Sequence, residues 1–496
     1  MEVKVKVERP EKEKTEALVV GIFEETKRFS REVAALDKAL GGVIQNALNS
    51  GDFKGKPNQV YLIPSMGKIP AARVVLTGLG KEKEFTIEKV RQAAGRSALY
   101  LSGLGLTSFS TILHHEMKPL RGASQAILEG CILGLYRFDK YKTNDNGNSK
   151  REITAITLLV DGREEEKAAW DGAFTGKVLA EAANFTKDMV NEPSNYMTPS
   201  IMAETAMLLA KNFKLKCKIL GRDEMESLGM GSLLGVARGS AEPPKFIILE
   251  YNMGRKGKPV VLVGKAITFD TGGISIKPAE NMEQMKSDMA GGAAVMGTFM
   301  AIAGLKLPLN VVGLIPAVEN MPGGNAYKPG DILKAMNGKT IEVISTDAEG
   351  RLILADALAY AKRYEPKGVI NIATLTGACV VALGKNATGM LGTDDKLKVM
   401  LKDAGERAFE RVWELPLWEE YEELLKSDIA DMKNAGAREA GTIAGGIFLK
   451  KFTDYPWVHL DIAGTSWNSK EGPYRPKGAT GVGVRLLTEF LMGWKE

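Results

Sequence analysis

The order of apolar and polar residues predicts short strands and helices in the first third of the chain. Apolar runs of strand length, bounded by turn residues, predict strands at residues 18–22, 60–63, 71–76 and 153–160. Pro64 would end the second of these, because proline cannot donate to a strand ladder. Helical periodicity predicts a helix over residues 87–100, and the polar, turn-rich segment 141–151 predicts an exposed loop.

A long stretch of helical periodicity over residues 164–190 predicts a helix that connects two domains. Beyond residue 200, short apolar runs are followed by glycine-rich turns and helices, which is typical of a buried sheet covered on both faces. These runs lie at residues 246–249, 260–263, 311–315, 341–344, 369–372 and 458–462. We therefore expect an α/β protein: a smaller N-terminal α/β domain (1–165), then a larger C-terminal domain (166–496) with a mixed, mostly parallel sheet covered by helices.

The amino-acid composition limits which partners and which cellular compartment we expect for the protein. The 496 residues are 44% hydrophobic and 26% charged, and the net charge is only +5. This balance does not call for nucleic acid or an anionic membrane as the main partner. No apolar run approaches the roughly 18 residues needed to cross a bilayer, and the N-terminus lacks a signal-peptide core. With three cysteines far apart in the sequence, we expect a cytoplasmic protein without disulfides.

Histidine is scarce, which limits the kinds of metal or hydrolytic site that the chain can form. The chain has only His114, His115 and His459. A metal or hydrolytic site must therefore be built mostly without imidazole, which weakens Ser-His-Asp, Cys-His and histidine-rich zinc interpretations together. A site rich in carboxylates is the remaining interpretation.

Two segments combine carboxylates, basic residues and glycines directly after apolar strands, at residues 264–292 and 345–352. In open α/β sheets, ligands gather at the carboxyl ends of the strands. Four acids there, converging without countercharge, would be strongly unfavourable, and two divalent cations would resolve this. These acids are Asp270, Asp288, Asp347 and Glu349.

Neighbouring residues suggest how such a site would work. Gly272 and Gly273 allow close backbone approach or positive φ. Asp347 and Glu349, two residues apart, can aim at one point if the backbone stays extended. Lys265 could ligate a metal as the neutral amine, because a nearby cation and burial depress its pKa. Two further cations, Lys277 and Arg351, would then point at the substrate.

Each of these residues also has a plainer interpretation. A single acid is more often a solvated loop residue or a helix cap, and Asp288 could cap a helix running from about residue 290 to 303. Lys277 and Arg351 could be ordinary surface charges. Only the joint clustering in two strand-end loops favours a metal site.

The same residues resemble the cytosol (leucyl) aminopeptidase family, from about residue 165 to the end. The most specific match is Thr346-Asp347-Ala348-Glu349-Gly350-Arg351-Leu352. Lys265, the turn at 269–273, Lys277 and the segment 287–289 resemble the family's other metal-site stretch. Further matches lie at 319–322, 328–331, 373–378 and 459–464. The first domain resembles the family more loosely.

The resemblance implies a role for each matched position. Asp270 and Glu349 would bridge two divalent ions, Mn²⁺ or Zn²⁺, with Lys265 and Asp288 completing one site and Asp347 the other. Lys277 would stabilise the oxyanion, and Arg351 would hold a bicarbonate ion as general base. The pocket for an apolar N-terminal side chain would be lined by Met285, Thr374, Gly377 and Ala463, although Met285 could equally be a core methionine.

The resemblance thus implies a two-metal aminopeptidase acting on peptides, assembled as a homohexamer. Two other functions are weighed against it. A DNA-binding role is not forbidden by the charge, but no basic cluster or recognition helix is evident. A phosphoryl-transfer enzyme could use similar acids and metals, but the glycine-rich stretches lack the GxxxxGK[ST] phosphate loop.

Overall fold

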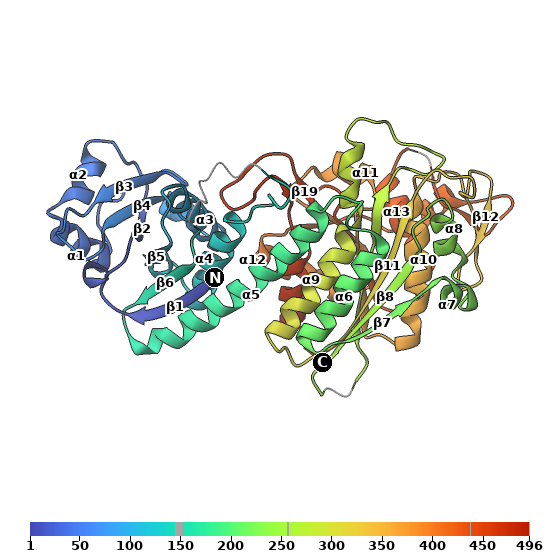
Figure 1. Cartoon of the computed structure of the whole chain (residues 1–496), viewed down its shortest axis with the longest axis horizontal. Helices are drawn as coiled ribbons and strands as arrows, with labels where there is room; N and C mark the ends of the chain where they lie inside the picture. The colour runs from blue at the N-terminus through green and yellow to red at the C-terminus, as the bar shows by residue number, and fades with distance from the viewer. Residues whose placement is uncertain (144–151, 255–256, 437, 496) are drawn as a thin grey trace. The chain divides into compact units, whose positions relative to one another are not determined.

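The computed structural model describes residues 1–143, 152–254, 257–436 and 438–495 (Figure 1). The chain forms two compact units, Met1–Glu181 with Lys470–Lys477, and Ala182–Ser469 with Gly478–Glu496. Helix α5 (Arg163–Asn191) carries the chain from the first unit into the second, as the periodicity predicts. The domain boundary at residues 165 and 166 stays a prediction, and the expected loop at 141–151 lies outside the described residues from residue 144 onward.

The N-terminal unit is built on a six-stranded sheet in the order β1-β6-β5-β2-β4-β3. In that order the strands are β1 (Glu2–Val7), β6 (Ala155–Val160), β5 (Ser108–Thr111), β2 (Leu18–Phe23), β4 (Arg73–Gly80) and β3 (Val60–Pro64). Every neighbouring pair is parallel except β3 with β4. Because β3 is an edge strand, Pro64 is tolerated as its last residue.

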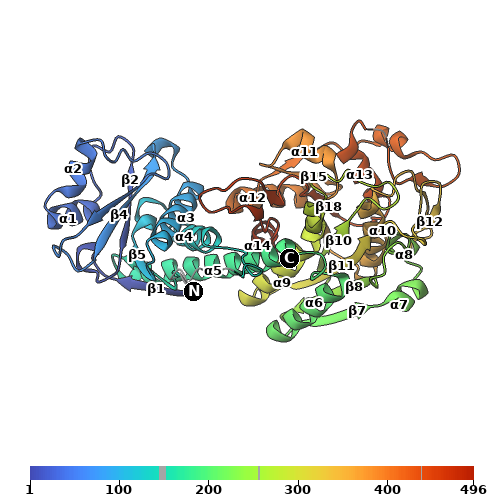
Figure 2. The same ribbon diagram turned by 45° about the horizontal axis from the view of Figure 1, so that its top comes forward.

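Helices cover this sheet (Figure 2): α1 (Arg31–Leu40), α2 (Val43–Asn49), α3 (Ile87–Gly103) and α4 (Leu120–Gly134). Leu36 and Leu40 of α1 and Ile44 of α2 are buried against Val20 and Leu76 of the sheet. Short 3₁₀ turns lie at η1 (Pro10–Lys12), η2 (Glu82–Glu84) and η3 (Leu113–Glu116). The unit is therefore a helix-covered α/β domain.

The C-terminal unit contains a nine-stranded mixed sheet in the order β16-β15-β18-β14-β9-β11-β8-β7, with β10 beside β11. In that order the strands are β16 (Val412–Glu414), β15 (Thr388–Gly392), β18 (Trp457–Asp461), β14 (Gly368–Ala373), β9 (Val260–Gly264), β11 (Asn310–Asn320), β8 (Lys245–Asn252), β7 (Lys216–Leu220) and β10 (Ala266–Asp270). The central strands β18, β14, β9 and β11 are parallel, so their carboxyl ends share one edge.

Helices pack on both faces of the central strands (Figure 1). One face carries α6 (Pro199–Phe213), α9 (Ala290–Gly304), α12 (Asp395–Ala408) and α14 (Val484–Met492); the other carries α8 (Gly231–Ala237), α10 (Glu349–Ala361) and α13 (Gly441–Lys450). Strands β9 and β14 are wholly buried, as covered parallel strands must be. The predicted fold class is confirmed.

Smaller elements complete the unit: α7 (Arg222–Ser227), η4 (Met282–Met289), η5 (Lys362–Tyr364), α11 (Gly377–Leu383), η6 (Glu419–Leu425), β12 (Ile332–Lys334), β13 (Thr340–Glu342), β17 (Met432–Lys433), β19 (Trp467–Asn468) and β20 (Gly478–Ala479).

The strand expected at 341–344 is only partly present. It shortens to β13, which pairs with β12 and β17 in a separate small sheet. The backbone N–H of Ile344 donates instead to the Asn434 side chain, at 2.7 Å, and this ends the strand.

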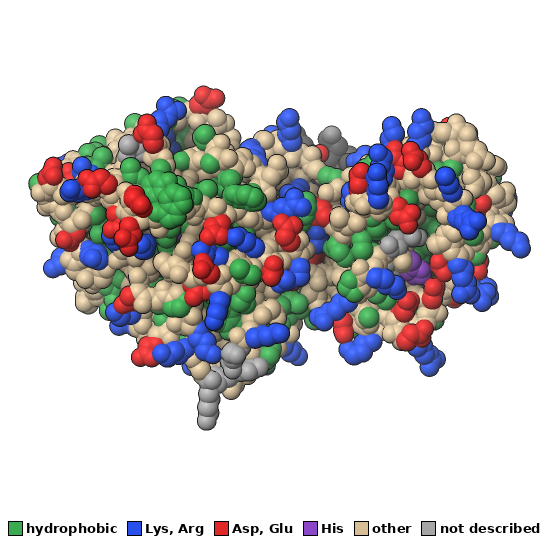
Figure 3. All heavy atoms as spheres, turned by 180° about the vertical axis from the view of Figure 1, so that it is seen from behind, with side chains coloured by type: hydrophobic (Ala, Val, Ile, Leu, Met, Phe, Trp, Pro, Cys, Tyr) green, Lys and Arg blue, Asp and Glu red, His purple; other side chains and the backbone are tan. Residues whose placement is uncertain are grey.

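The face of the molecule in Figure 3 carries basic and acidic side chains interspersed across its surface. This mixture agrees with the small net charge of +5. Within the described ranges, none of the helices combines the length and the apolar character required to span a bilayer.

Candidate metal centre

A pocket of about 340 Å³ opens in the C-terminal unit beside the carboxyl ends of β9, β10, β14 and β18. Every predicted site residue except Arg351 lines it. These residues are Lys265, Asp270, Lys277, Met285, Asp288, Asp347, Glu349, Thr374, Gly377 and Ala463. The fold therefore brings together side chains from four separate stretches of the sequence.

The first acid of the site is placed by the end of a strand and a glycine turn. Strand β10 ends at Asp270, and the chain then turns through Gly272 and Gly273 with φ of 86° and 68°. The N–H of Gly272 donates to Asp270 Oδ1 at 2.9 Å. A Cβ atom on Gly273 would lie 2.8 Å from Asn320 Oδ1. Both glycines thus have the conformation that the sequence predicts, and side chains there would be strained.

Thr346 joins the two predicted loops. Its hydroxyl donates to the Gly272 carbonyl at 2.6 Å and accepts from the Ser275 N–H at 2.7 Å. Asn320, the last residue of β11, donates from Nδ2 to Asp270 Oδ1 at 2.8 Å and to the Thr346 carbonyl at 2.9 Å. These bonds fix Asp270 relative to the loop that carries Asp347. The sequence showed Asn320 only as part of a matched string, without a role.

The expectation of an extended backbone from Asp347 to Glu349 is wrong. Helix α10 begins at Glu349, and Asp347 lies in the turn before it. The partial positive charge of a helix N-terminus stabilises a carboxylate in the first turn, so the start of α10 partly offsets the burial of Glu349. A Cβ atom on Gly350 would lie 2.6 Å from Lys265 Nζ, so a glycine is needed for the lysine to reach the start of the helix.

Lys265 and Asp288 form the inner wall of the pocket. Lys265 Nζ lies 2.8 Å from Glu349 Oε1, and it donates to Asp288 Oδ1 at 2.9 Å and to the Thr374 carbonyl at 2.8 Å. Asp288 Oδ1 also accepts from the Thr374 hydroxyl at 2.6 Å. The alternative that Asp288 caps α9 is wrong, because the residue before that helix is Met289 and no side chain caps it.

Negative charge exceeds positive charge in this pocket. One oxygen each from Asp270, Asp288 and Glu349 lies within 4.8 Å of the others, and all three residues are buried. Lys277 Nζ lies 2.8 Å from Asp270 Oδ2 and also pairs with Asp347. Four carboxylates thus face two ammonium groups, those of Lys265 and Lys277.

The pKa values reflect this crowding. Burial, followed by the charge of Asp270, raises the pKa of Glu349 to about 8, and burial raises that of Asp288 to about 6. Burial lowers the pKa of Lys265, but Asp288, Glu349 and Asp270 outweigh it and raise the pKa overall. The protein alone therefore favours the ammonium form of Lys265, and a metal ion would have to replace its proton.

Divalent cations fit these residues. Within the described part of the chain, Glu349 Oε2 and Asn320 Oδ1 are buried and accept no hydrogen bond. Buried polar atoms are ordinarily paired, so these oxygens point to a missing positive partner. Carboxylate oxygens with one amine suit zinc, manganese, magnesium or cobalt.

Arg351 lies beside the pocket and does not line it. The side chain is buried, donates from Nη1 to the Asn434 carbonyl at 2.6 Å, and lies 5.9 Å from the Phe448 ring centre. Burial lowers the pKa of this guanidinium to about 10. Its assignment as a bicarbonate-binding residue stays a prediction.

Asp461, the last residue of β18, was missed as a functional residue. It is fully buried and accepts hydrogen bonds from the Thr376 hydroxyl at 2.7 Å and from the N–H groups of Leu375 and Ala463 at 3.2 and 3.1 Å. All three donors belong to pocket-lining residues. An acid at the end of an apolar strand, inside the matched string 459–464, was the signal available in the sequence.

Fold and site together define an α/β protein with a carboxylate-lined candidate cation site at the carboxyl edge of its sheet. Comparison with known proteins identifies the family. Residues 184–488 match the catalytic domain of the cytosol aminopeptidase family, and residues 19–145 match its N-terminal domain. The chain belongs to the cytosol aminopeptidase family, which supports a metal-dependent aminopeptidase, a hydrolase.

Named relatives agree over the full length. A probable cytosol aminopeptidase of Geotalea uraniireducens (strain Rf4) is 51% identical, with 100% of both chains covered. Another, of Geobacter sulfurreducens, is 48% identical over 96% of each chain. Among solved structures, the bottromycin maturation enzyme BotP in complex with Mn is similar with a TM-score of 0.85 and 33% identity, covering 96% of this chain and 98% of that one.

Proposed function

We propose that the protein removes the N-terminal residue from peptides, preferentially an apolar residue such as leucine, with two divalent metal ions per chain. The observation that carries this proposal is the convergence of Asp270, Asp288 and Glu349 within 4.8 Å at the carboxyl edge of the sheet. Family membership supports the reaction class.

The ligands are assigned from the pocket geometry and the resemblance. Asp270 and Glu349 would serve both ions, Lys265 and Asp288 would complete one set of ligands, and Asp347 would complete the other. Manganese or zinc is the expected metal, and the Mn complex of the similar BotP structure supports manganese. When bound, such ions supply Lewis-acid polarisation and lower the pKa of water.

Lys277 is assigned to the substrate carbonyl. Burial lowers its pKa, but Asp270, Glu349 and Asp347 outweigh this effect and raise the pKa, so the side chain stays cationic. Its ammonium group lies at the pocket, where negative charge would develop on the carbonyl oxygen. A fixed donor at that position stabilises the transition state more than the ground state.

Arg351 is assigned to a bicarbonate ion that acts as general base. Two observations support this assignment: the pocket has no histidine among its lining residues in the described chain, and Arg351 is a buried cation two residues after Glu349. Activity of the Arg351→Met variant should be low and independent of added bicarbonate, whereas wild-type activity should rise with bicarbonate. A wild-type enzyme indifferent to bicarbonate would contradict this assignment.

The specificity pocket is assigned to Met285, Thr374, Gly377 and Ala463. Leu375, Val380 and Trp467 line the same pocket and add apolar surface. Gly377 has open space where a Cβ atom would be, so it leaves room for a substrate side chain. An apolar N-terminal residue would bury its side chain there.

The deciding experiment is metal-dependent hydrolysis of a panel of aminoacyl p-nitroanilides. We expect turnover of the leucyl substrate that is lost on chelation and restored by manganese or zinc. N-acetyl-leucyl p-nitroanilide should resist, because a blocked amine cannot ligate a metal ion. Asp270→Ala should bind less metal and lose activity. Equal hydrolysis of the free and acetylated substrates, or full activity after chelation, would refute the proposal.

A homohexamer is also proposed, because the resemblance implies it. Large apolar side chains exposed in the C-terminal unit support an association surface: Val381 is 90% exposed and Ile429 is 67% exposed. Sedimentation velocity at micromolar concentration should show a species of six chains. A single monomeric boundary would contradict this part of the proposal without affecting the chemistry.

A further inference from the structure

Three polar side chains meet at the carboxyl edge of the N-terminal sheet, in the unit that does not contain the pocket described above. Strands β6, β5 and β2 are consecutive in the sheet and parallel, so they end at one edge. His115 follows β5 in η3, Asp161 follows β6 directly, and Glu32 lies in the first turn of α1 after β2. Ligand sites of open α/β sheets occur at such edges.

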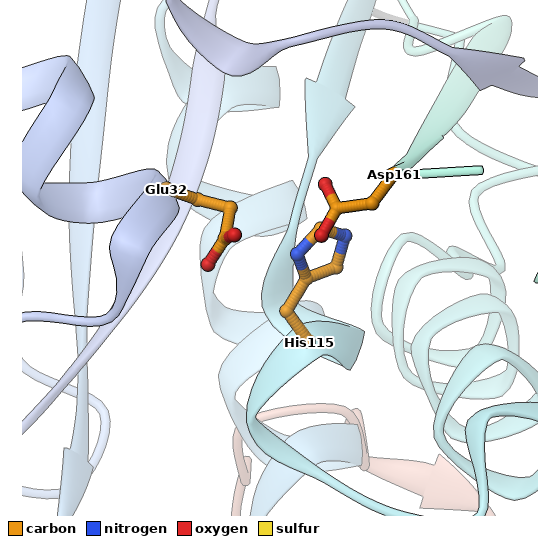
Figure 4. Close-up of side chains that lie close together, drawn as sticks. All are labelled: Glu32, His115 and Asp161. Carbon is orange, nitrogen blue, oxygen red and sulfur yellow. The ribbon is translucent and has the colours of Figure 1, made fainter.

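The side chains converge on one point (Figure 4). The side chains of Glu32, His115 and Asp161 point toward one another, and one ligand atom from each residue lies within 4.8 Å of the others. Glu32 and His115 are half-buried and Asp161 is exposed. Metal–ligand bonds of about 2.0–2.2 Å put ligand atoms up to about 4.3 Å apart. The three ligand atoms, which lie within 4.8 Å of one another, would therefore move closer together when an ion binds.

A backbone hydrogen bond orients the histidine as in metal sites. His115 Nε2 lies 2.8 Å from the Leu159 carbonyl oxygen. A carbonyl oxygen can only accept, so Nε2 is the donor, and in the neutral imidazole Nδ1 carries the lone pair. A histidine ligand usually donates its other N–H to a carbonyl or carboxylate in this manner.

Among the described residues, no lysine or arginine pairs with the carboxylate of Glu32 or Asp161. Within the described part of the chain, neither Glu32 nor Asp161 makes a side-chain hydrogen bond or an ion pair, although Arg9 and Arg31 line the adjoining pocket. That pocket has a volume of about 370 Å³ and is also lined by Glu8 and Glu11. It gives solvent, and therefore a hydrated ion, access to the cluster.

From this geometry we infer that Glu32, His115 and Asp161 form a second metal site, in the N-terminal unit, that binds one divalent transition metal ion such as zinc. One imidazole nitrogen and two carboxylate oxygens suit zinc, cobalt or nickel better than calcium. Water from the pocket would fill the remaining coordination positions. The ion would link α1 to the ends of β5 and β6 and stabilise this unit.

Zinc itself is the probe, because the catalytic pocket is lined by no histidine among the described residues. The full-length protein is chelated and then dialysed against micromolar zinc, and bound zinc is counted per chain. Wild type should bind one equivalent more than Glu32→Gln, His115→Gln or Asp161→Asn. The zinc X-ray absorption spectrum should contain an imidazole contribution in wild type that disappears in His115→Gln and persists in Asp270→Ala.

Controls separate this site from charge effects and from the proposed catalytic site. Glu8→Gln removes the same charge from a residue lining the same pocket and should keep the full zinc count. Leucyl p-nitroanilide hydrolysis by His115→Gln should equal that of wild type. Asp161 is exposed, so its variant should fold normally even if the others do not. Equal zinc counts in wild type, Asp161→Asn and His115→Gln, or an unchanged imidazole contribution in His115→Gln, would overturn the inference whatever the outcome of the peptidase assays.

Discussion

Lys277 is the residue whose chemistry is most open to test. Its ammonium group contacts Asp270 and Asp347 and keeps its charge, while its side chain remains 22% exposed to the pocket. Replacing it by methionine should leave metal content unchanged and reduce kcat by roughly 10²–10³-fold, the usual effect of removing one oxyanion donor. Metal analysis and steady-state kinetics of Lys277→Met measure both quantities.

Lys385 offers a matched control, because it is another lysine lining the same pocket. Its ammonium group donates to Ser469 at 3.1 Å and not to a carboxylate of the site. Lys385→Met should keep kcat close to the wild-type value. Equal losses in both variants would mean that the pocket needs positive charge in general, and Lys277 would lose its specific role.

Asp461 should act on substrate binding by holding the pocket wall. The carboxylate accepts hydrogen bonds from Leu375, Thr376 and Ala463. In Asp461→Asn an amide NH₂ group would face at least one of these donors, and an unsatisfied buried donor costs about 1–3 kcal/mol. We expect KM for the leucyl substrate to rise about tenfold with metal content unchanged, while Asp403→Asn on the exposed part of α12 changes neither. An unchanged KM would show that the wall holds without this carboxylate.

At the scale of single residues, the sequence predicted the residue types that line the pocket but not the hydrogen bonds between them. Asp270, Asp347 and Glu349 were found because each follows an apolar strand in a specific motif. Asp461 and Asn320 were not assigned roles, because their partners lie far away in the sequence: Asp461 binds residues 375 and 376, and Asn320 binds residues 270 and 346. Such pairings depend on sheet order, which local patterns do not contain.

Among the elements, β5 is tied to the segment before β2 by Glu16. The carboxylate accepts from the Thr107 hydroxyl at 2.6 Å and the Ser108 hydroxyl at 2.9 Å. The Thr107 hydroxyl is the main reason that the pKa of Glu16 is lower than its usual value, although burial acts in the opposite direction. Because the folded pKa is the lower one, this stabilisation is present above the unfolded pKa of about 4.3 and is lost as pH falls through the folded pKa.

The variant Glu16→Gln should therefore reduce the free energy of unfolding by about 1 kcal/mol at pH 7, a modest value because the group is only partly buried. The difference from wild type should shrink below about pH 4, where the wild-type carboxyl becomes protonated. Urea unfolding of the full chain across this pH range measures it. Glu82→Gln, at an exposed position, should show no such trend. A difference independent of pH would exclude the charged hydrogen bonds as its cause.

Strands were predicted correctly from the sequence where burial alone determines the structure. Strands β9, β14 and β18 were predicted within one or two residues, since wholly apolar runs can only be buried. It failed after residue 342, where Asn434 binds the N–H groups of residues 344 and 345, and at Glu349, where a helix starts at once. In both places a partner remote in sequence, or a helix end, outweighs the local pattern.

For the whole molecule, both units use the same arrangement: parallel strands deliver polar side chains to one edge of a sheet. In the C-terminal unit specific motifs made the site visible in the sequence. In the N-terminal unit no motif links Glu32, His115 and Asp161, which follow three different strands. No histidine lines the pocket of the C-terminal unit among the described residues, but the scarcity of histidine could not show where His115 would lie.

Metal binding should stabilise the C-terminal unit measurably. Without cations, the buried carboxylates of Asp270, Asp288 and Glu349 repel one another within 4.8 Å. A ligand at 100 times its Kd stabilises the folded state by about 2.7 kcal/mol, which for a domain of this size raises Tm by several degrees. We therefore expect manganese added to the chelated protein to raise Tm in a concentration-dependent manner.

Two variants test which site causes the manganese-dependent increase in Tm. His115→Gln removes the proposed N-terminal ligand and should retain the manganese-dependent increase in Tm, because the buried carboxylates of the C-terminal pocket are intact. Asp270→Ala should lose most of the increase, since the acid lying between Asn320 and Lys277 is removed from the centre of the cluster. Equal increases in Asp270→Ala and wild type would mean that manganese stabilises the protein elsewhere, and the carboxylate cluster would lose its role as the metal centre.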